Sequence, residues 1–287
     1  MVWFLYALLA AFCLSTTDAL CKKALKETDE LVVAWVRFGF ALPFLFLFML
    51  PGEIPPLDRT FWKTLGMLLP LEVTAIFLYI KAIKVSPLSL TIPFLSLTPV
   101  FLIVTSFLIL GEFPDRSGLT GVFLIACGAY LLNLHHGKKG ILAPLRSIVK
   151  EKGSLMMIGV AFIYSITSNL GKIATLHSSP LFFGMFYTLV LTMILTPFAF
   201  FRMMKIPFYF KPQLKTFLLI GFFYALMTIG HYQAIARVEV VYMISIKRMS
   251  LVFSVLYGGF IFHEENIGER LVGSLVMIMG VIFITVL

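Results

Sequence analysis

Five charged or titratable side chains lie deep inside stretches of the sequence that are otherwise apolar. Lys247 and Arg248 follow each other within one run, and Arg37, Glu72 and His231 each lie in a different run. A Lys or Arg at the centre of a membrane helix costs roughly 2.5–3.5 kcal/mol on insertion scales, so such residues persist where they bind, pair or move a proton. The sequence therefore indicates these five side chains as the candidates for chemistry.

Lys247 and Arg248 are the strongest candidates because of their depth. They lie six to eight residues inside the run from about 241 to 262, which is on the order of 10 Å below the interface at 1.5 Å per residue. Adjacent helical residues project about 100° apart, so at least one of the two must point toward the bundle. We expect the pair to form a fixed positive site for an anionic group. A snorkelling pair that sets helix depth and a structural ion pair are the alternatives.

Glu72 and His231 are the candidates for proton transfer. Glu72 is eleven residues into the run from about 61 to 81, where a lone carboxylate would be largely neutral unless it pairs with a cation. Pairing with one of the three cations is the simpler interpretation, and exchange of a proton is the alternative. His231, about five residues from the end of its run, could relay protons or serve as a hydrogen-bonded histidine within a bundle.

The composition of the chain excludes a soluble protein. Its 287 residues are 60% hydrophobic and 13% charged, and the mean hydropathy is +1.00. An ordinary soluble domain is roughly 45–50% apolar and about 25% charged, and a single anchor would be diluted by the rest of the chain. The net charge of +9 lies mainly in connecting stretches, where it bears on orientation in a membrane. We expect a multi-pass protein of the cell membrane, with bilayer lipid and no nucleic acid as its partner.

Ten apolar runs, bounded by charged residues, Pro or Gly, fall into two sets of five. They cover about 2 to 21, 31 to 50, 61 to 81, 88 to 110 and 118 to 134, and then 154 to 174, 180 to 201, 216 to 236, 241 to 262 and 268 to 287. Unbroken runs of about 20 residues predict spanning helices, whereas a β-barrel would show alternation. The prediction is an all-α integral membrane protein with five helices in 1–134, a basic linker at 135–153 and five helices in 154–287.

The two sets repeat each other. The stretch from Ala11 to Ala24 aligns without a gap with that from Ala161 to Ala174. Further matches lie 152 positions apart: Glu112 and Glu264, Gly121 and Gly273, Gly128 and Gly280. These matches indicate one duplicated five-helix unit. Because five is odd, the second copy must enter the membrane from the opposite side, so we expect inverted repeats about an in-plane pseudo-two-fold axis.

This plan resembles the EamA-type transporters of the drug/metabolite transporter superfamily. The resemblance is carried by the ten-span arrangement and by Gly111-Glu112 and Glu264, whose glutamates each lie nine residues before a glycine. It covers the whole chain and implies a secondary transporter with a central cavity between its halves. That family carries amino acids, drugs, sugars and phosphorylated metabolites, so the resemblance names no substrate.

The fourth predicted span is interrupted by Pro93 and Pro99, which break the backbone hydrogen bonding and free carbonyl groups a turn earlier. This stretch aligns with Lys247 and Arg248 at an offset of 152 or 153. Interrupted helices at corresponding places mark binding sites in transporters, and a kink for packing is the alternative. The Lys-Arg pair also resembles the anion-binding pair of the phosphate translocators in the same superfamily, which favours a phosphate or carboxylate substrate.

Three further residues are expected to contact the substrate or to face the cavity that holds it. Tyr79 and Tyr232 correspond at an offset of 153 and are predicted to contact the substrate. Arg37 has no counterpart cation in the second half and is predicted to face the cavity.

Two lysines recur near the ends of matching helices. Lys172 repeats Lys22, and each is either a snorkelling lysine or one of two cations near the two gates. Asp18 lies four residues before Lys22, which suits an intrahelical pair.

The sequence contains no motif of a zinc protease, a serine esterase or a nucleotide-hydrolysing site, and its three cysteines have no CxxC spacing. We therefore expect no enzyme, cofactor or metal, and transport driven by a gradient or by exchange. The first hypothesis is a secondary active transporter of a small organic anion or zwitterionic metabolite, with alternating access around a midplane site. The alternative is a flippase for a phosphate-bearing lipid.

Two arguments about orientation disagree. The basic stretches fall on the side opposite both termini, which the positive-inside rule makes cytoplasmic. Members of the superfamily more often have both termini in the cytoplasm. We therefore predict no orientation from the sequence.

Overall fold

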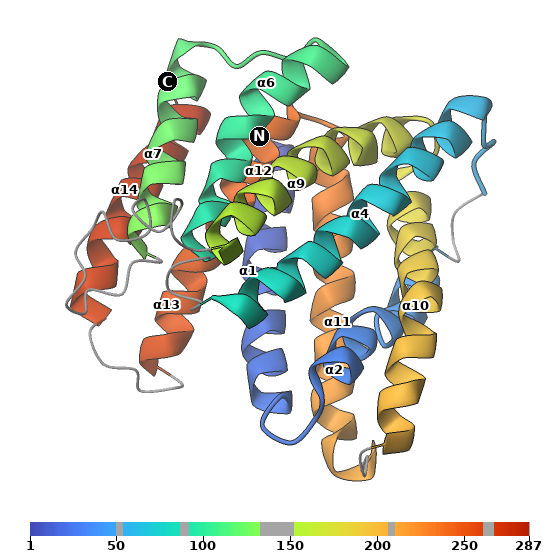
Figure 1. The fold of residues 1–287 in the computed structure, drawn as a ribbon. Coiled ribbons are helices and arrows are strands. Elements are labelled where there is room, and N and C mark those ends of the chain that lie inside the picture. The colour runs from blue at the N-terminus through green and yellow to red at the C-terminus, as the bar shows by residue number, and fades with distance from the viewer. Residues whose placement is uncertain (50–53, 87–91, 133–151, 206–209, 261–266, 287) are drawn as a thin grey trace.

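The computed structural model is helical throughout the part of the chain that it describes, residues 1–49, 54–86, 92–132, 152–205, 210–260 and 267–286, which contains no strand (Figure 1). The first repeat contains α1 (Val2–Ala24), α2 (Glu30–Gly39), α3 (Leu42–Met49), α4 (Arg59–Val85), the 3-10 helix η1 (Ile92–Leu97), α6 (Thr98–Leu110) and α7 (Arg116–Leu132). The second contains α9 (Lys152–Leu176), α10 (Pro180–Lys205), α11 (Phe210–Ile235), α12 (Val240–Lys247), α13 (Ser250–Phe260) and α14 (Ile267–Thr285).

Within these residues, seven helical stretches are long and apolar enough to cross a membrane: Val2–Ala24, Glu30–Met49, Arg59–Tyr79, Lys152–Leu176, Pro180–Met204, Gln213–Ile235 and Val240–Tyr257. Three shorter apolar helices accompany them: Phe94–Leu110, Arg116–Leu131 and Val272–Thr285. These three occupy the fourth, fifth and tenth predicted spans. The prediction of an all-α, multi-pass integral membrane protein is confirmed.

Helix boundaries follow from local chemistry. Asp29 and Asp58 precede α2 and α4, and their carboxylates accept the backbone N–H groups of Leu31 and Phe61 at 2.9 and 2.8 Å. These bonds satisfy donors that the first turn of a helix leaves without intrahelical partners. The α6 helix ends at Gly111, whose φ of 71° is the left-handed conformation that glycine adopts at a helix C-terminus.

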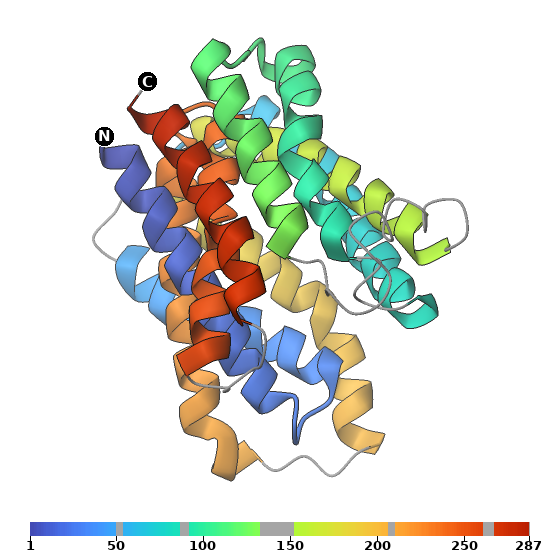
Figure 2. The same ribbon diagram turned by 90° about the vertical axis from the view of Figure 1, so that its left-hand side faces the viewer.

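The helices pack in pairs that respect the duplication. The first helix of the chain, α1, packs along α11, and its counterpart α9 packs along α4, which is the counterpart of α11. The last helices of the two repeats, α7 and α14, pack against each other, and they lie side by side in both views (Figures 1 and 2). These main helix packings therefore join one repeat to the other.

The recurring glycines have a structural role at the contact of α7 with α14. A Cβ atom at Gly121 would lie 2.6 Å from the carbonyl oxygen of Gly280, and one at Gly128 would lie 2.6 Å from that of Gly273. Because no side-chain carbon approaches a backbone oxygen so closely, glycine is required for the two backbones to pack. The contact is symmetric, because in each case the first glycine of one repeat meets the second glycine of the other. The matching Glu264 lies outside the described residues.

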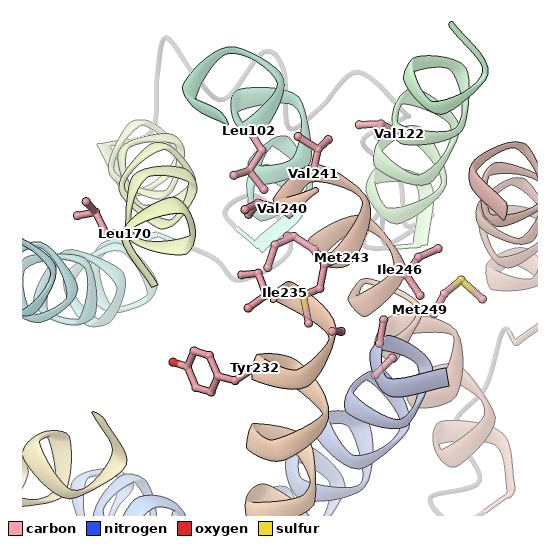
Figure 3. Close-up of a cluster of buried hydrophobic side chains, with 14 of the residues drawn as sticks. Leu102, Val122, Leu170, Tyr232, Ile235, Val240, Val241, Met243, Ile246 and Met249 are labelled. Carbon is pink, nitrogen blue, oxygen red and sulfur yellow. The ribbon is translucent and has the colours of Figure 1, made fainter. Parts of the chain in front are cut away.

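The largest buried cluster lies where α6, α7, α11 and α12 meet. Figure 3 shows Leu102 of α6, Val122 of α7 and Ile235 of α11 around Val240 and Val241 of α12. All five of these side chains are fully buried. This cluster fills the space between the repeats at the face of the bundle where α1 begins and α14 ends, here called the terminal face.

Replacing Gly121 by Ala should destabilise the protein, because the added methyl group must displace the Gly280 carbonyl. Overpacking of this kind costs about 1–3 kcal/mol, against a gain in helix propensity of up to about 1 kcal/mol. The control is Gly66→Ala in α4, where a Cβ meets nothing within 4 Å and should be neutral or stabilising. Thermal unfolding in detergent measures both. Equal melting temperatures for the two variants would contradict the packing role of Gly121.

Candidate functional site

A cavity of about 380 Å³ lies between the two repeats. It is lined by Arg37, Glu72, His231, Lys247 and Arg248, by the tyrosines Tyr164, Tyr187, Tyr224 and Tyr232, and by Leu14, Phe38, Leu68, Ile76, Thr98, Thr167, Ser168, Gly171, Met227, Ile244 and Ser250. The structure thus brings all five intramembrane charged or titratable candidates of the sequence to one wall. They come from α2, α4, α11 and the junction of α12 with α13.

Lys247 and Arg248 lie at a break in the ninth span. The α12 helix ends at Lys247, Arg248 follows as its C-cap, and α13 begins at Ser250. The backbone N–H of Arg248 still bonds to the carbonyls of Ile244 and Ser245 at 3.2 and 3.1 Å. Both side chains line the cavity, although a continuous helix would point them about 100° apart. The break is what lets two consecutive residues serve the same space.

The Lys247 ammonium contacts a histidine. Its Nζ lies 3.2 Å from Nδ1 of His231. An ammonium can only donate, so Nδ1 accepts and the proton of the neutral ring is assigned to Nε2. The His231 ring in turn packs edge-on against Tyr232, with ring centroids 4.7 Å apart. His231 therefore holds Lys247 in place, and Tyr232 holds His231.

Arg37 faces the cavity but is shared with an acidic residue. Its Nη1 lies 3.1 Å from Oδ1 of Asp18 in α1, and its guanidinium lies over the ring of Tyr224, 5.0 Å from the centroid. The spacing of the sequence pairs Asp18 with Lys22, one turn further along the helix. The structure places Arg37 of α2 against Asp18 of α1, and only the packing of these two helices could reveal this partner.

Two guanidinium donors in the wall are buried without a hydrogen-bond partner in the described part of the chain. These are Nε of Arg37 and Nε of Arg248. An unsatisfied buried donor costs about 1–3 kcal/mol, and more when it is charged. Arg248 makes no ion pair within the described residues either, so it is the cation in the wall whose charge the protein leaves least compensated.

Glu72 approaches the cavity from α4. The hydroxyl groups of Thr167 and Tyr187 lie beside its carboxylate, and Lys247 acts on it at longer range. Among the described residues no cation forms an ion pair with Glu72. The simpler interpretation of the sequence, direct pairing with one of the three cations, is therefore not what this structure contains.

The structure places the remaining predicted residues in different settings. Tyr232 lines the cavity, whereas Tyr79 does not and packs in an apolar cluster with Ala75, Met157 and Val160. Met157 and Val160 belong to α9, along which α4 packs.

The prolines of the fourth span lie at a second break. Pro93 is in η1, and Pro99 is in the first turn of α6, where its missing N–H removes no helical hydrogen bond. Thr98, at the junction of η1 and α6, lines the cavity. Both the fourth and the ninth spans are therefore interrupted beside the same space.

The two ends of the cavity differ. At the terminal face α12 packs against α6, whereas toward the opposite face, here called the linker face, η1 and α13 pack on other helices and have little contact with each other in the described residues. Asp18, on the linker side of the wall, has 49% of its side chain exposed. The cavity is therefore closed more tightly toward the terminal face.

Comparison with known proteins gives one family and one fold. The model of the EamA-like transporter family matches residues 1–134 and 151–286. A solved protein crystal structure aligns with 99% of this chain and 96% of its own, with a TM-score of 0.75 at 15% sequence identity. At that identity the likeness concerns the fold alone. No curated protein matches the sequence.

Removing Asp18 should destabilise the protein, because it leaves the Arg37 guanidinium inside the bundle without its counterion. Since both side chains are partly exposed, with 27% of Arg37 and 49% of Asp18 accessible, we expect about 1–2 kcal/mol for Asp18→Asn, below the 3–5 kcal/mol of a fully buried pair. The Asp18→Asn, Arg37→Gln double variant should recover part of the loss.

The matched control is Arg202→Gln, which removes a looser contact with Asp29 at 3.9 Å and should change stability by less than about 1 kcal/mol. Thermal unfolding in detergent measures the set. Additive losses in the double variant would show that Asp18 and Arg37 do not interact.

Proposed function

The chain belongs to the EamA-like transporter family, and from this membership we propose that it is a secondary active transporter of a small organic anion or zwitterionic metabolite. Its substrate would bind in the cavity between the repeats. A volume of about 380 Å³ lies within the range of roughly 300–1,000 Å³ that is usual for small-molecule sites. The substrate and bilayer lipid would be its partners, and the cell membrane its location.

The observation that carries the proposal is the state of Lys247 and Arg248. Lys247 contacts the ring of His231, and Arg248 has a buried Nε without a partner in the described residues. Neither is neutralised by a carboxylate there, unlike Arg37, which is paired with Asp18. A phosphate or carboxylate would satisfy both cations, and the planar fork of an arginine suits two oxygens of such a group.

Other groups in the cavity lining would bind the rest of the substrate. Glu72 lies there with the hydroxyls of Thr167 and Tyr187, so an ammonium group could bind to its carboxylate. Tyr164, Tyr224 and Tyr232 add aromatic faces and hydroxyl groups. Because the lining holds a carboxylate as well as cations, a zwitterion is proposed beside a simple anion.

Alternating access would follow from the duplication. The seven long and three shorter apolar helices would supply ten crossings, five in each repeat, and an odd number turns the second repeat over in the membrane. The matched packing of α1 on α11 and α9 on α4 supports this inverted arrangement. The breaks in the fourth and ninth spans lie beside the cavity and would let their two halves move separately.

Proton coupling would involve Glu72, with His231 as a relay. Glu72 lies in the wall without an ion pair in the described residues, so its carboxylate is available for a proton. His231 lies beside Lys247, so proton movement there would be coupled to the cation that holds the substrate.

Substitution of the cation pair tests the substrate site. Lys247→Met and Arg248→Lys should each weaken binding of the anion roughly 10- to 150-fold, because each loses a charge-assisted hydrogen bond worth about 1.5–3 kcal/mol. The ligand is first identified by uptake of labelled metabolites and lipids into proteoliposomes, and affinity is then measured by calorimetry. Uptake of a phosphate-bearing lipid alone would favour a flippase.

The matched controls are Lys215→Met and Arg237→Lys, two exposed cations outside the cavity, which should bind as the wild type does. Wild-type affinity in folded Lys247→Met and Arg248→Lys protein would remove the pair from the site.

Glu72→Gln tests coupling. Because glutamine cannot exchange a proton, the variant should lose uptake driven by a pH gradient and keep substrate counterflow, which needs no net proton movement. Glu30→Gln, an exposed carboxylate at the start of α2, is the control and should keep both activities. Unchanged pH-driven uptake in Glu72→Gln would leave Glu72 as a structural residue only.

A further inference from the structure

Glu112 and Lys172 form an ion pair across the two repeats at the terminal face. Glu112 follows Gly111 at the end of α6, and Lys172 lies near the end of α9. Only 9% of the Lys172 side chain and 19% of the Glu112 side chain is exposed. The positive φ of Gly111 reverses the chain at this point, and the Glu112 N–H bonds back to Ser106. The Gly-Glu sequence thus positions the carboxylate.

The same carboxylate caps a helix of the other repeat. Oε2 of Glu112 accepts the backbone N–H of Val240 at 3.0 Å, the first residue of α12. The N-cap residue Glu239 makes no side-chain cap bond of its own. Lys172 also donates to the carbonyl of Val238 at 2.8 Å. Two charged side chains therefore join the end of α6, the end of α9 and the start of α12.

A second contact supports the first. The Tyr242 hydroxyl donates to Oδ1 of Asp115 at 2.9 Å and accepts the Asp115 N–H at 3.1 Å. Tyr242 lies over Gly118, where a Cβ would be 2.0 Å from its hydroxyl oxygen. The hydroxyl of Tyr242 and the N–H of Gly118 hold the pKa of Asp115 below its usual value, so the carboxylate is ionised and α12 is bound to the turn before α7.

These contacts lie between the cavity and the terminal face. Lys172 directly follows Gly171, which lines the cavity together with Ser168 of the same helix. The α12 helix has Val240 bonded to Glu112 at its start and Lys247 in the cavity wall at its end. A movement of α12 that opened the terminal face would have to break the bonds to Glu112 and would displace Lys247 as well.

We propose that the Glu112–Lys172 pair is the lock that holds the cavity closed toward the terminal face, and that it breaks whenever the protein opens there. The bond from the Val240 N–H to Glu112 ties the lock to closure at the terminal face, because this bond exists only while the start of α12 lies against the end of α6. The inference rests on alternating access in the proposed function, but on no property of the substrate.

The rate of thiol labelling in the cavity tests the lock. Ser168→Cys is introduced into protein whose Cys13, Cys21 and Cys127 are replaced by Ala, and a membrane-impermeant thiol reagent is added from the terminal face of oriented proteoliposomes. Glu112→Gln and Lys172→Met should each raise the labelling rate roughly 10-fold, the effect of losing one charge-assisted hydrogen bond on the open population. The double variant should label no faster than the faster single variant, because both changes break one lock.

Two controls separate the lock from general loosening. Asp58→Asn removes another carboxylate at the same face, which contacts Nδ1 of His177 at 2.7 Å, while asparagine still caps α4, and it should label as slowly as the parent. Lys172→Arg keeps the charge and should also label slowly. Glu112→Gln keeps the shape of the side chain and an oxygen that can accept the Val240 N–H, so it is the variant most compatible with folding.

An unchanged rate in folded Glu112→Gln and Lys172→Met protein would overturn the proposal, and so would an equal rise in Asp58→Asn. Labelling needs no substrate. The labelling rates therefore test the lock alone, whereas the proposed substrate site is tested only by the affinities of the Lys247 and Arg248 variants.

Discussion

A charged group inside a membrane must find its partner within the protein, and this constraint organises the interior of the chain. Arg37 is compensated by Asp18 and by the ring of Tyr224, and Lys247 is held by His231. Every one of these contacts joins different helices. The helices are therefore fixed relative to one another by the need to solvate a few charges as much as by apolar packing, which the lipid tails could provide equally well.

The duplication explains how so apolar a chain keeps a polar interior. The first helix of each repeat packs along a helix of the other, and the last helices meet through glycines whose backbones nearly touch. Close backbone packing at α7 and α14 stabilises one side of the bundle without polar groups. The fourth and ninth spans can then change helix type at Thr98 and near Lys247, and both residues line the cavity.

The sequence repeat is nearly symmetric, but the structure is not. The terminal face is closed by α12 on α6, by the buried cluster around Val240 and by Glu112 with Lys172, whereas Asp18 toward the linker face is half exposed. In the proposed transport cycle the two repeats would exchange these unequal roles. An asymmetric structure of a duplicated chain is the physical basis on which alternating access would operate.

The sequence by itself determined the class of protein and the residues that matter: unbroken apolar runs require helices in lipid, matching positions reveal the duplication, and the cost of an intramembrane charge singles out Arg37, Glu72, His231, Lys247 and Arg248. It could not assign their partners. Spacing along the chain suggested Lys22 as a partner of Asp18 and matched Tyr79 with Tyr232 as substrate contacts. It gave no sign that Arg37 of another helix contacts Asp18, or that Tyr79 packs in an apolar cluster with residues of α9. Only tertiary structure decided these points, because an ion pair depends on which helices lie side by side and where a helix is broken, and neither is encoded within a single helix.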